Sequence, residues 1–216
     1  MNIEVITAIT GEHRELLIDD QPIDENVIYT AYTEQNSKFW NIKPPYQEFK
    51  DQKANAKIHK ILSHKYSEAN ITLWIDGTIQ LLIPPSEIIN EFLTDEVDMI
   101  ILENDSLDFS NVFNQGEFIL NNKLCNHAKV IPQLNKYSKL NFPNVMTNNK
   151  FIIRRNNEKI NEFNDAWWAE ICKYSFRDQL SLSYLIDKYK INFKLLPVSE
   201  HSKYFNFFNH SKIKYN

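Results

Sequence analysis

The chain has 216 residues, of which 43% are hydrophobic and 13% aromatic, and a chain of this size buries about 70% of its surface on folding. Its net charge of −4, with acidic and basic residues mixed along the chain, argues against a general nucleic-acid-binding protein, which would carry a basic face. Only three glycines and two cysteines occur, which excludes a glycine-rich phosphate loop, a disulfide framework and a zinc cluster.

The N-terminus shows no basic leader followed by an apolar stretch, and no apolar run approaches the roughly 20 residues of a membrane span. We therefore expect a cytoplasmic protein without a transmembrane segment. The length fits one domain over residues 1–216, with a tail at 191–216. Because this tail is rich in aromatic residues and lysine, it could contact the inner face of a membrane peripherally. The alternative is a terminal segment that docks on the protein itself.

Segments typical of strands and of amphipathic helices alternate along the chain. We predict strands at 3–9, 27–32, 71–75, 97–102, 151–155 and 193–196, and helices at 54–66, 87–93, 126–140, 165–174 and 179–189. Ser86 is the expected N-cap of the second helix. Pro44-Pro45 excludes a helix nearby, and residues 109–125 are ambiguous. The alternation predicts an α/β fold with a mostly parallel sheet flanked by helices on both faces.

The stretch at 70–80 is the centre of the functional argument. Its apolar run at 71–75 is typical of a buried strand, and Asp76 and Gly77 follow at the carboxyl end. In open α/β sheets, ligands bind just outside the carboxyl ends of strands, and a glycine lets the backbone approach a ligand closely. Asp76 is therefore a candidate to bind a ligand hydroxyl or a metal. The alternative is that the Asp-Gly pair only begins a turn.

The predicted helix at 54–66 carries a cationic face. Its apolar residues recur at spacings of three and four, whereas Lys57 and Lys60 lie on the other faces. Next to the Asp76 strand, these lysines could hold a phosphate. The alternative is a solvated charged face, which is the usual condition of a surface helix.

Polar residues also end other predicted strands. Thr10 follows the first strand, Asp105 and Asp108 follow the fourth, and Arg154 and Arg155 end the fifth. An arginine can hold an oxyanion through charge-assisted hydrogen bonds. The alternative for the arginines is surface pairing with carboxylates, and the acidic residues could belong to an ordinary polar loop.

The helix at 165–174 contains Trp167 and Trp168. Adjacent helical residues point about 100° apart, so one of the two rings must lie near the surface. A flat apolar ring there would suit stacking on an acceptor sugar. The alternative is that both rings pack in the core.

Asp178 and Gln179 open the next helix, where the helix macrodipole favours negative charge. Either residue could therefore face a reacting centre. Ser175 and Asp178 also have the spacing of a capping box, which would engage the same carboxylate and weaken its catalytic role.

Two histidines, His201 and His210, lie in the tail among aromatic residues. Imidazole and carboxylate ligands suit manganese-like ions, so a tail histidine could complete a metal site begun by Asp76. The alternative is a plain surface histidine, because no ligand spacing singles out either residue.

Several motifs occur together in one order: Thr7-Ala-Ile-Thr-Gly11, Asn55-Ala-Lys-Ile-His-Lys60 with His64, Trp74-Ile-Asp-Gly77, Phe151-Ile-Ile-Arg-Arg155, and Trp167-Trp-Ala-Glu-Ile171 with Ser175-Phe-Arg-Asp-Gln-Leu180. Over residues 3–190 they resemble the glycosyltransferase-like family that includes the plant mucilage-related and turgor-defect proteins. The resemblance implies a GT-A-like fold and transfer of a sugar from a nucleotide-sugar donor to a glycan or lipid-linked acceptor.

The resemblance also implies roles for individual residues. Donor contacts would come from Thr7, Ala8, Thr10, Gly11, Lys57, Lys60, Trp74, Asp76, Gly77 and Arg154, catalysis from Asp178 and Gln179, and acceptor contacts from Trp167 and Trp168. As the counterpart of an Asp-x-Asp element, Asp76 would bind Mn²⁺ or Mg²⁺. The matched motifs do not include the tail, so His210 is a candidate further ligand from its chemistry alone. Because Thr78 replaces the second aspartate, a catalytically silent module that binds nucleotide sugars or glycans is the rival interpretation.

Overall fold

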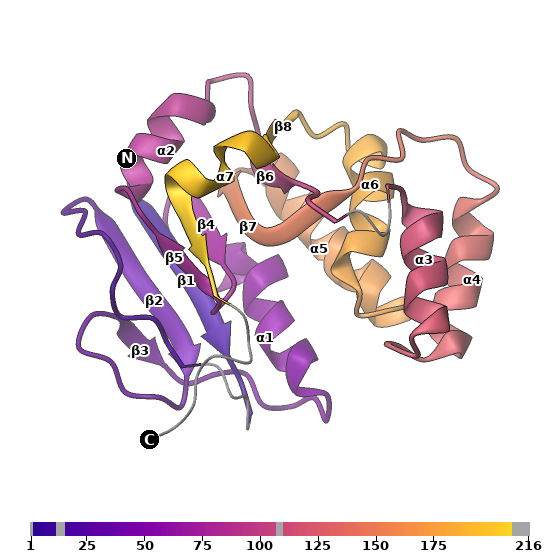
Figure 1. Ribbon diagram of the computed structural model, residues 1–216, viewed down its shortest axis with the longest axis horizontal. Coiled ribbons are helices and arrows are strands. Elements are labelled where there is room, and N and C mark those ends of the chain that lie inside the picture. Colours follow the sequence, from indigo (N-terminus) through magenta and orange to yellow (C-terminus); the bar gives the residue numbers. More distant parts are fainter. Residues whose placement is uncertain (1, 12–15, 107–109, 209–216) are drawn as a thin grey trace.

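The computed structural model describes residues 2–11, 16–106 and 110–208. A seven-stranded sheet with the order β3-β2-β1-β4-β7-β6-β8 forms its centre (Figure 1). Its strands are β1 (Ile3–Ile9), β2 (Val27–Thr33), β3 (Asn41–Lys43), β4 (Ile71–Ile75), β6 (Met99–Glu103), β7 (Thr147–Arg155) and β8 (Phe193–Leu196). β7 is antiparallel to both of its neighbours and all other pairs are parallel. The predicted mostly parallel α/β sheet is confirmed.

Helices cover both faces of this sheet. One face packs against α1 (Gln52–Ile61), α5 (Glu158–Lys173) and α6 (Asp178–Lys188) through a core that includes Trp74, Ile152 and Trp167. The short 3₁₀ helix η1 (Ser63–Lys65) follows α1. The other face packs against α2 (Pro85–Phe92), α7 (Val198–Tyr204) and the small sheet of β5 (Ile79–Leu81) and β9 (Phe205–Phe207). Burial on both sides explains why every residue of β1 and β4 is buried.

Two further helices, α3 (Val112–Asn121) and α4 (His127–Tyr137), lie side by side beyond α6 (Figure 1). They pack on α6 through their own apolar cluster, which includes Ile119, Tyr137 and Leu180. α3 occupies the segment whose pattern is ambiguous in the sequence. Asn111 and Asn126 cap the two helices with their side chains.

Several local predictions differ from the structure. α5 begins at Glu158 and β7 at Thr147, whereas the sequence predicts starts at 165 and 151. The short edge strand β3, which is not among the predicted strands, ends just before Pro44-Pro45. Ser86 is not the N-cap of its helix: α2 begins at Pro85, whose missing N–H and fixed φ suit the first helical position. No helix in the described part of the chain has both the length and the apolar character needed to cross a membrane.

The strand order places the expected site. The chain runs from β1 outward to β2 and β3, then returns to place β4 on the opposite side of β1. The carboxyl ends of β1 and β4 therefore border a switch point, where ligands bind in open α/β sheets. Because β7 is antiparallel to β4, its amino end at Thr147 lies at this edge, and Arg154 pairs with Thr72, away from it. The expectation that Arg154 stands at the site edge of the sheet is wrong.

Candidate active site

A pocket of about 630 Å³ opens at this switch point. Its first wall, the inner wall, consists of the ends of β1 and β4, the lysine-bearing face of α1 and the first residues of α6. The second, the outer wall, is formed by the α3–α4 turn with the start of α4 and by the turn between α5 and α6. Eight of the residues predicted for the site line the pocket: Ala8, Lys57, Lys60, Trp74, Asp76, Gly77, Asp178 and Gln179.

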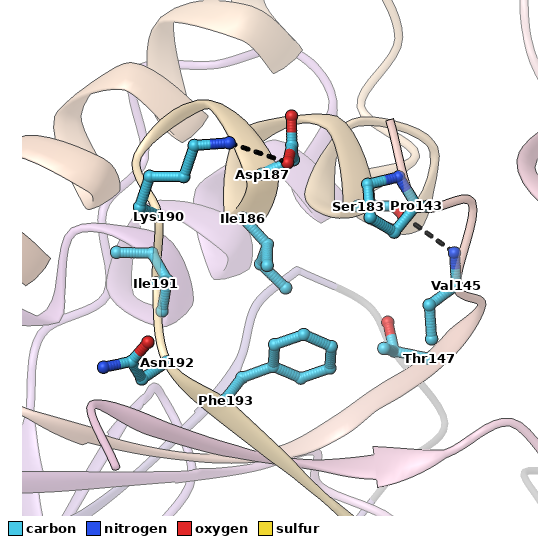
Figure 2. Close-up of a pocket in the computed structure, with 10 residues that line it drawn as sticks. All are labelled: Pro143, Val145, Thr147, Ser183, Ile186, Asp187, Lys190, Ile191, Asn192 and Phe193. Carbon is cyan, nitrogen blue, oxygen red and sulfur yellow. Dashed lines mark hydrogen bonds and ion pairs between the residues drawn. The ribbon is translucent and has the colours of Figure 1, made fainter. Parts of the chain in front are cut away.

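A second cavity, of about 260 Å³, lies between the carboxyl-terminal half of α6 and the start of β8. Figure 2 shows Ile186 and Phe193 directed into it, with an ion pair between Lys190 and Asp187 at its rim. None of the predicted site residues that the structure describes lines this cavity. The charged groups that could act on a substrate gather in the larger pocket.

The carboxylate of Asp178 lines the larger pocket and lies at the centre of its charged network. Lys57 Nζ contacts one carboxylate oxygen, and the other accepts from Lys60 Nζ at 3.0 Å and from Asn149 Nδ2 at 3.4 Å. Asp178 is the first residue of α6, and its carboxylate is engaged by these side chains rather than by a capping box. Burial would raise its pKa, but the two ammonium groups outweigh burial and hold the pKa of Asp178 well below its usual range.

Asp76 extends this ion-pair network to the end of β4. Its Oδ1 atom accepts from the indole Nε1 of Trp74 at 2.7 Å and lies 3.4 Å from Lys60 Nζ. The Lys60 ammonium also lies 5.7 Å from the centre of the Trp74 ring. The Asp76 side chain keeps 34% of its surface exposed and opens to the pocket. Asp76 does begin a turn, in which the N–H of Ile79 donates to the Asp76 carbonyl at 2.9 Å, and its carboxylate is at the same time a member of the network.

The two lysines are not a solvated helix face. The Lys60 side chain is 6% exposed and lies between two carboxylates, whereas that of Lys57 is 20% exposed and contacts one. Burial acts to lower both pKa values. The attraction of Asp178 and Asp76 outweighs it for Lys60, whose pKa is raised, while the pKa of Lys57 is lowered. Lys60 thus holds the network together, and Lys57 is the cation with more access to a ligand.

Two residues that the sequence argument did not single out hold the catalytic candidates in place. Asn149 contacts Asp178 and accepts a hydrogen bond from Thr147 Oγ1 at 2.7 Å. Gln115 donates to Gln179 Oε1, while Gln179 Nε2 donates to the carbonyl of Thr147, both at 2.7 Å. The polar run before the apolar part of β7 was the available signal. Recognising it requires knowing that β7 is antiparallel, since only then does its amino end reach the site.

Thr7, Thr10 and Gly11 of the first motif stand apart from the pocket lining. Thr7 is buried, the Thr10 hydroxyl donates to the carbonyl of Gln52 at 2.6 Å, and Gly11 adopts a φ of +71°. None of these three lines the pocket, whereas the intervening Ala8 and Ile9 do. Thr10 and Gly11 instead hold the end of β1 close to the start of α1.

Arg154 and Trp167 are structural residues here. The guanidinium of Arg154 is buried and donates to the carbonyls of Lys60 and Ile61 and to Asn164 Oδ1. Burial lowers its pKa to about 9. The Trp167 ring is 0% exposed, so the prediction that it stacks on an acceptor is wrong. Arg154 supports the end of α1 that carries Lys60 instead of facing the donor.

Trp168 is partly buried behind the pocket. Its ring packs against Phe49 and Phe176, with centroids 5.7 and 6.3 Å away. Phe176, together with Tyr174, lines the pocket in its place. An aromatic surface therefore lines the pocket, and Phe176 and Tyr174 form it instead of Trp167 and Trp168.

Comparison with known proteins identifies the family to which the chain belongs. A family model described as the TOD1/MUCI70 glycosyltransferase-like domain matches residues 23–212. The chain belongs to the TOD1/MUCI70 family. The pocket therefore lies in a glycosyltransferase-like domain.

A curated relative, the probable hexosyltransferase MUCI70 of Arabidopsis thaliana, is 25% identical over 163 residues, which are 65% of this chain and 26% of the relative. The chain thus spans about a quarter of that protein's length. Among solved structures, a glycosyltransferase involved in the glycosylation of the major capsid of PBCV-1 superposes with a TM-score of 0.51 at 9% identity, over 91% of this chain and 82% of that one. This likeness concerns the fold, which is GT-A-like.

A divalent cation is the cofactor that membership of a glycosyltransferase-like family implies. Within the described ranges, no group of three or more His, Cys, Asp or Glu side chains could hold one alone. Mg²⁺, however, is usually held by one or two carboxylates together with substrate phosphates. Asp76 Oδ2 has no hydrogen bond among the described residues, so Asp76 fits a cation shared with a diphosphate.

Two other candidate ligands, His201 and Asp105, are engaged elsewhere. His201 is buried and bonded to the carbonyl of Leu196 at 3.0 Å, and Asp105 accepts from Asn148 at 3.0 Å. Asp108 and His210 lie outside the described residues. Phe208, the last described residue, donates its N–H to the carbonyl of Thr78 at 2.8 Å, so the described chain ends beside the Asp76 turn.

Proposed function

We propose that this member of the TOD1/MUCI70 family transfers a sugar, of the hexose type, from a nucleotide-sugar donor to a hydroxyl of a glycan or lipid-linked acceptor. The observation that carries the proposal is the convergence of Lys57, Lys60, Asp76 and Asp178 in one pocket at the strand-order switch point. The volume of about 630 Å³ is within the usual range for ligand sites.

The donor's parts match successive parts of the inner wall. The nucleoside would lie against Ala8 and Ile9 at the end of β1, and Asp76 would contact its ribose or the cation. Lys57 and Lys60 would approach the diphosphate, which acquires negative charge as the glycosidic bond breaks. Preorganised cations aimed at developing charge are usually the largest contribution to such catalysis.

Asp178 would act as the general base in an inverting reaction. The acceptor oxygen forms a bond to the anomeric carbon, the bond from that carbon to the phosphate oxygen breaks, and the nucleoside diphosphate leaves with the electron pair. The acceptor's proton passes to Asp178. While Lys57 and Lys60 neutralise Asp178 it is a weak base, so engagement of the lysines by the diphosphate would raise its pKa and make it a better base.

A retaining reaction would place Asp178 or Gln179 beneath the anomeric carbon. The amide of Gln179 is held at both ends, by Gln115 and by the Thr147 carbonyl. Asp178 lies in the centre of the charged network, so we assign it the leading role in either course.

The cation would be bound by Asp76 Oδ2 and the diphosphate together. When bound, it would supply charge stabilisation for the leaving phosphate. Because the protein contributes one carboxylate from the described residues, we expect Mg²⁺ or Mn²⁺ alone to leave the melting temperature unchanged. Together with the correct nucleotide, either ion should raise it, and Asp76→Ala should remove this additional rise.

The test of the function is release of nucleoside diphosphate from UDP-, GDP-, CMP- and dTDP-sugars (nucleoside monophosphate from CMP-sugars), with and without an acceptor glycan. We expect turnover of one nucleotide class, lost in Asp178→Asn and kept in Lys188→Met, a matched change at an exposed lysine of α6. Tight donor binding with no release under any condition would favour the rival, a catalytically silent binding module. The replacement of the second aspartate by Thr78 is what motivates that rival.

A further inference from the structure

The outer wall of the pocket carries cations of a different kind from those of the inner wall. Lys129, in the first turn of α4, and Arg177, just before α6, both line it. No carboxylate in the described part of the chain lies within ion-pairing distance of either. Among the described residues that line the pocket, the one carboxylate outside the central network is Asp51, which caps α1 by accepting from the N–H of Lys53.

Backbone carbonyls hold these two cations in place. Arg177 Nη2 donates to the carbonyl of Leu124 at 3.2 Å, and Lys129 Nζ donates to that of Lys173 at 3.4 Å. Cys125 Sγ, also in the wall, lies 3.3 Å from the hydroxyl of Ser175. The start of α4 is thereby tied to the turn between α5 and α6. These contacts direct the two cations along this wall, and no carboxylate of the described residues forms an ion pair with either.

Aromatic rings accompany the two cations. Phe176 and Tyr174 line the same wall, and Phe49 and Trp168 pack behind Phe176. A cationic wall that also offers apolar ring faces differs from a simple phosphate site. It suits a ligand that has both flat sugar faces and negative charge.

We propose that the outer wall is the acceptor subsite and that the acceptor carries an anionic group, a uronate carboxylate or a phosphate, bound by Arg177 and Lys129. This inference rests on the proposed function, which places the donor diphosphate at the inner wall on Lys57 and Lys60. The planar guanidinium of Arg177 can bind a carboxylate or phosphate through two parallel hydrogen bonds. The acidic protein, with a net charge of −4, thus presents positive charge where the acceptor enters.

The test uses calorimetric titration of the whole chain with three probes. They are a uronic-acid trisaccharide, its carboxyl-reduced neutral counterpart, and a monosaccharide joined to an alkyl group through a diphosphate. We expect an acidic probe to bind about tenfold or more tightly than the neutral one, with affinity that falls as salt is raised. Arg177→Gln and Lys129→Gln should each remove most of this preference. The acidic probe that binds more tightly shows whether the anionic group is a uronate carboxylate or a phosphate.

Donor binding, measured in the same variants, separates this inference from the proposed function. The Kd for the nucleoside diphosphate should stay within about twofold in Arg177→Gln and Lys129→Gln. Lys139→Gln, an exposed lysine just beyond α4, is the matched control and should change neither affinity.

Equal affinity for the acidic and neutral probes would overturn the inference, as would an equal loss of nucleotide and acidic-probe binding in the two variants. The second result would mean that these cations serve the donor. If wild-type protein binds no nucleotide but keeps the acidic preference, the transferase proposal fails and the anion site stands.

Discussion

The two walls of the pocket hold their cations in opposite ways. On the inner wall, Lys57 and Lys60 are neutralised by Asp178 and Asp76 and are largely buried. On the outer wall, Arg177 and Lys129 contact backbone carbonyls, and no carboxylate in the described part of the chain pairs with them. The ion pairs of the inner wall must rearrange before Lys57 or Lys60 can pair with a ligand. Arg177 and Lys129 can pair with a ligand without such a rearrangement, so substitutions on the two walls should have different consequences.

The largest effect should come from Asp178→Asn, which removes the charge that both inner lysines share but keeps the side-chain volume. Loss of a catalytic acid–base group lowers turnover by about 10²- to 10⁴-fold, and we expect a decrease of this size in kcat. Steady-state kinetics with a bound donor measures it. Unchanged turnover would remove Asp178 from the catalytic centre.

Lys60→Met should affect stability most. Removing one partner of a buried ion pair leaves uncompensated charge, and we expect a loss of about 3 kcal/mol in the free energy of unfolding. Lys57→Met should cost less, because the Lys57 side chain is more exposed and contacts one carboxylate. Urea unfolding of both variants gives the comparison. Equal losses would contradict the assignment of Lys60 as the residue that holds the network together.

The inner ion pairs also predict a pH dependence of stability. The pKa of Asp178 is lower in the folded protein than the unfolded value of about 3.9. Its stabilising contribution is therefore present above about pH 4 and is lost as the pH falls toward the folded value. The gap in unfolding free energy between wild type and Asp178→Asn should be constant from pH 8 to 5 and narrow below pH 4. A gap that widens with acid would show that the carboxylate is not held ionised.

The smallest of these effects should come from Asn149→Ala. Asn149 is a positioning residue that donates to Asp178 over 3.4 Å, and we expect kcat to fall by about tenfold with little change in donor affinity. Loss of this hydrogen bond should also raise the pKa of Asp178 and move the acid limb of the pH–rate profile upward. A fall in kcat without that movement would indicate a purely structural role.

The inner wall could be anticipated because its chemistry follows from where strands end. The apolar run at 71–75 predicts a buried strand, and the structure has β4 over those residues with Asp76 directly after it. The lysines of α1 and the first residues of α6 meet there because both helices pack on the same face. Alternation of strands and helices is enough to predict that these groups converge.

Other features depend on information that local patterns lack. An apolar strand has the same sequence pattern whether it is parallel or antiparallel. The pattern of β7 therefore predicts Arg154 at the site edge and gives no reason to single out Asn149. Trp167 and Trp168 are neighbours in one helix, and packing alone decides which is buried. The outer wall requires α3 and α4 to dock against α6 and to place Lys129 beside the turn that carries Arg177. No spacing in the sequence encodes that docking.

The most direct test of the central claim is a thermal-shift titration with nucleoside diphosphates and Mg²⁺ on wild type, Lys57→Met and Lys188→Met. A ligand that binds the native state raises the melting temperature. We predict that one nucleoside diphosphate raises the melting temperature of wild type and Lys188→Met, and raises that of Lys57→Met much less. An equal rise in all three proteins, or none in folded wild type, would contradict the assignment of this pocket to a nucleotide-sugar donor.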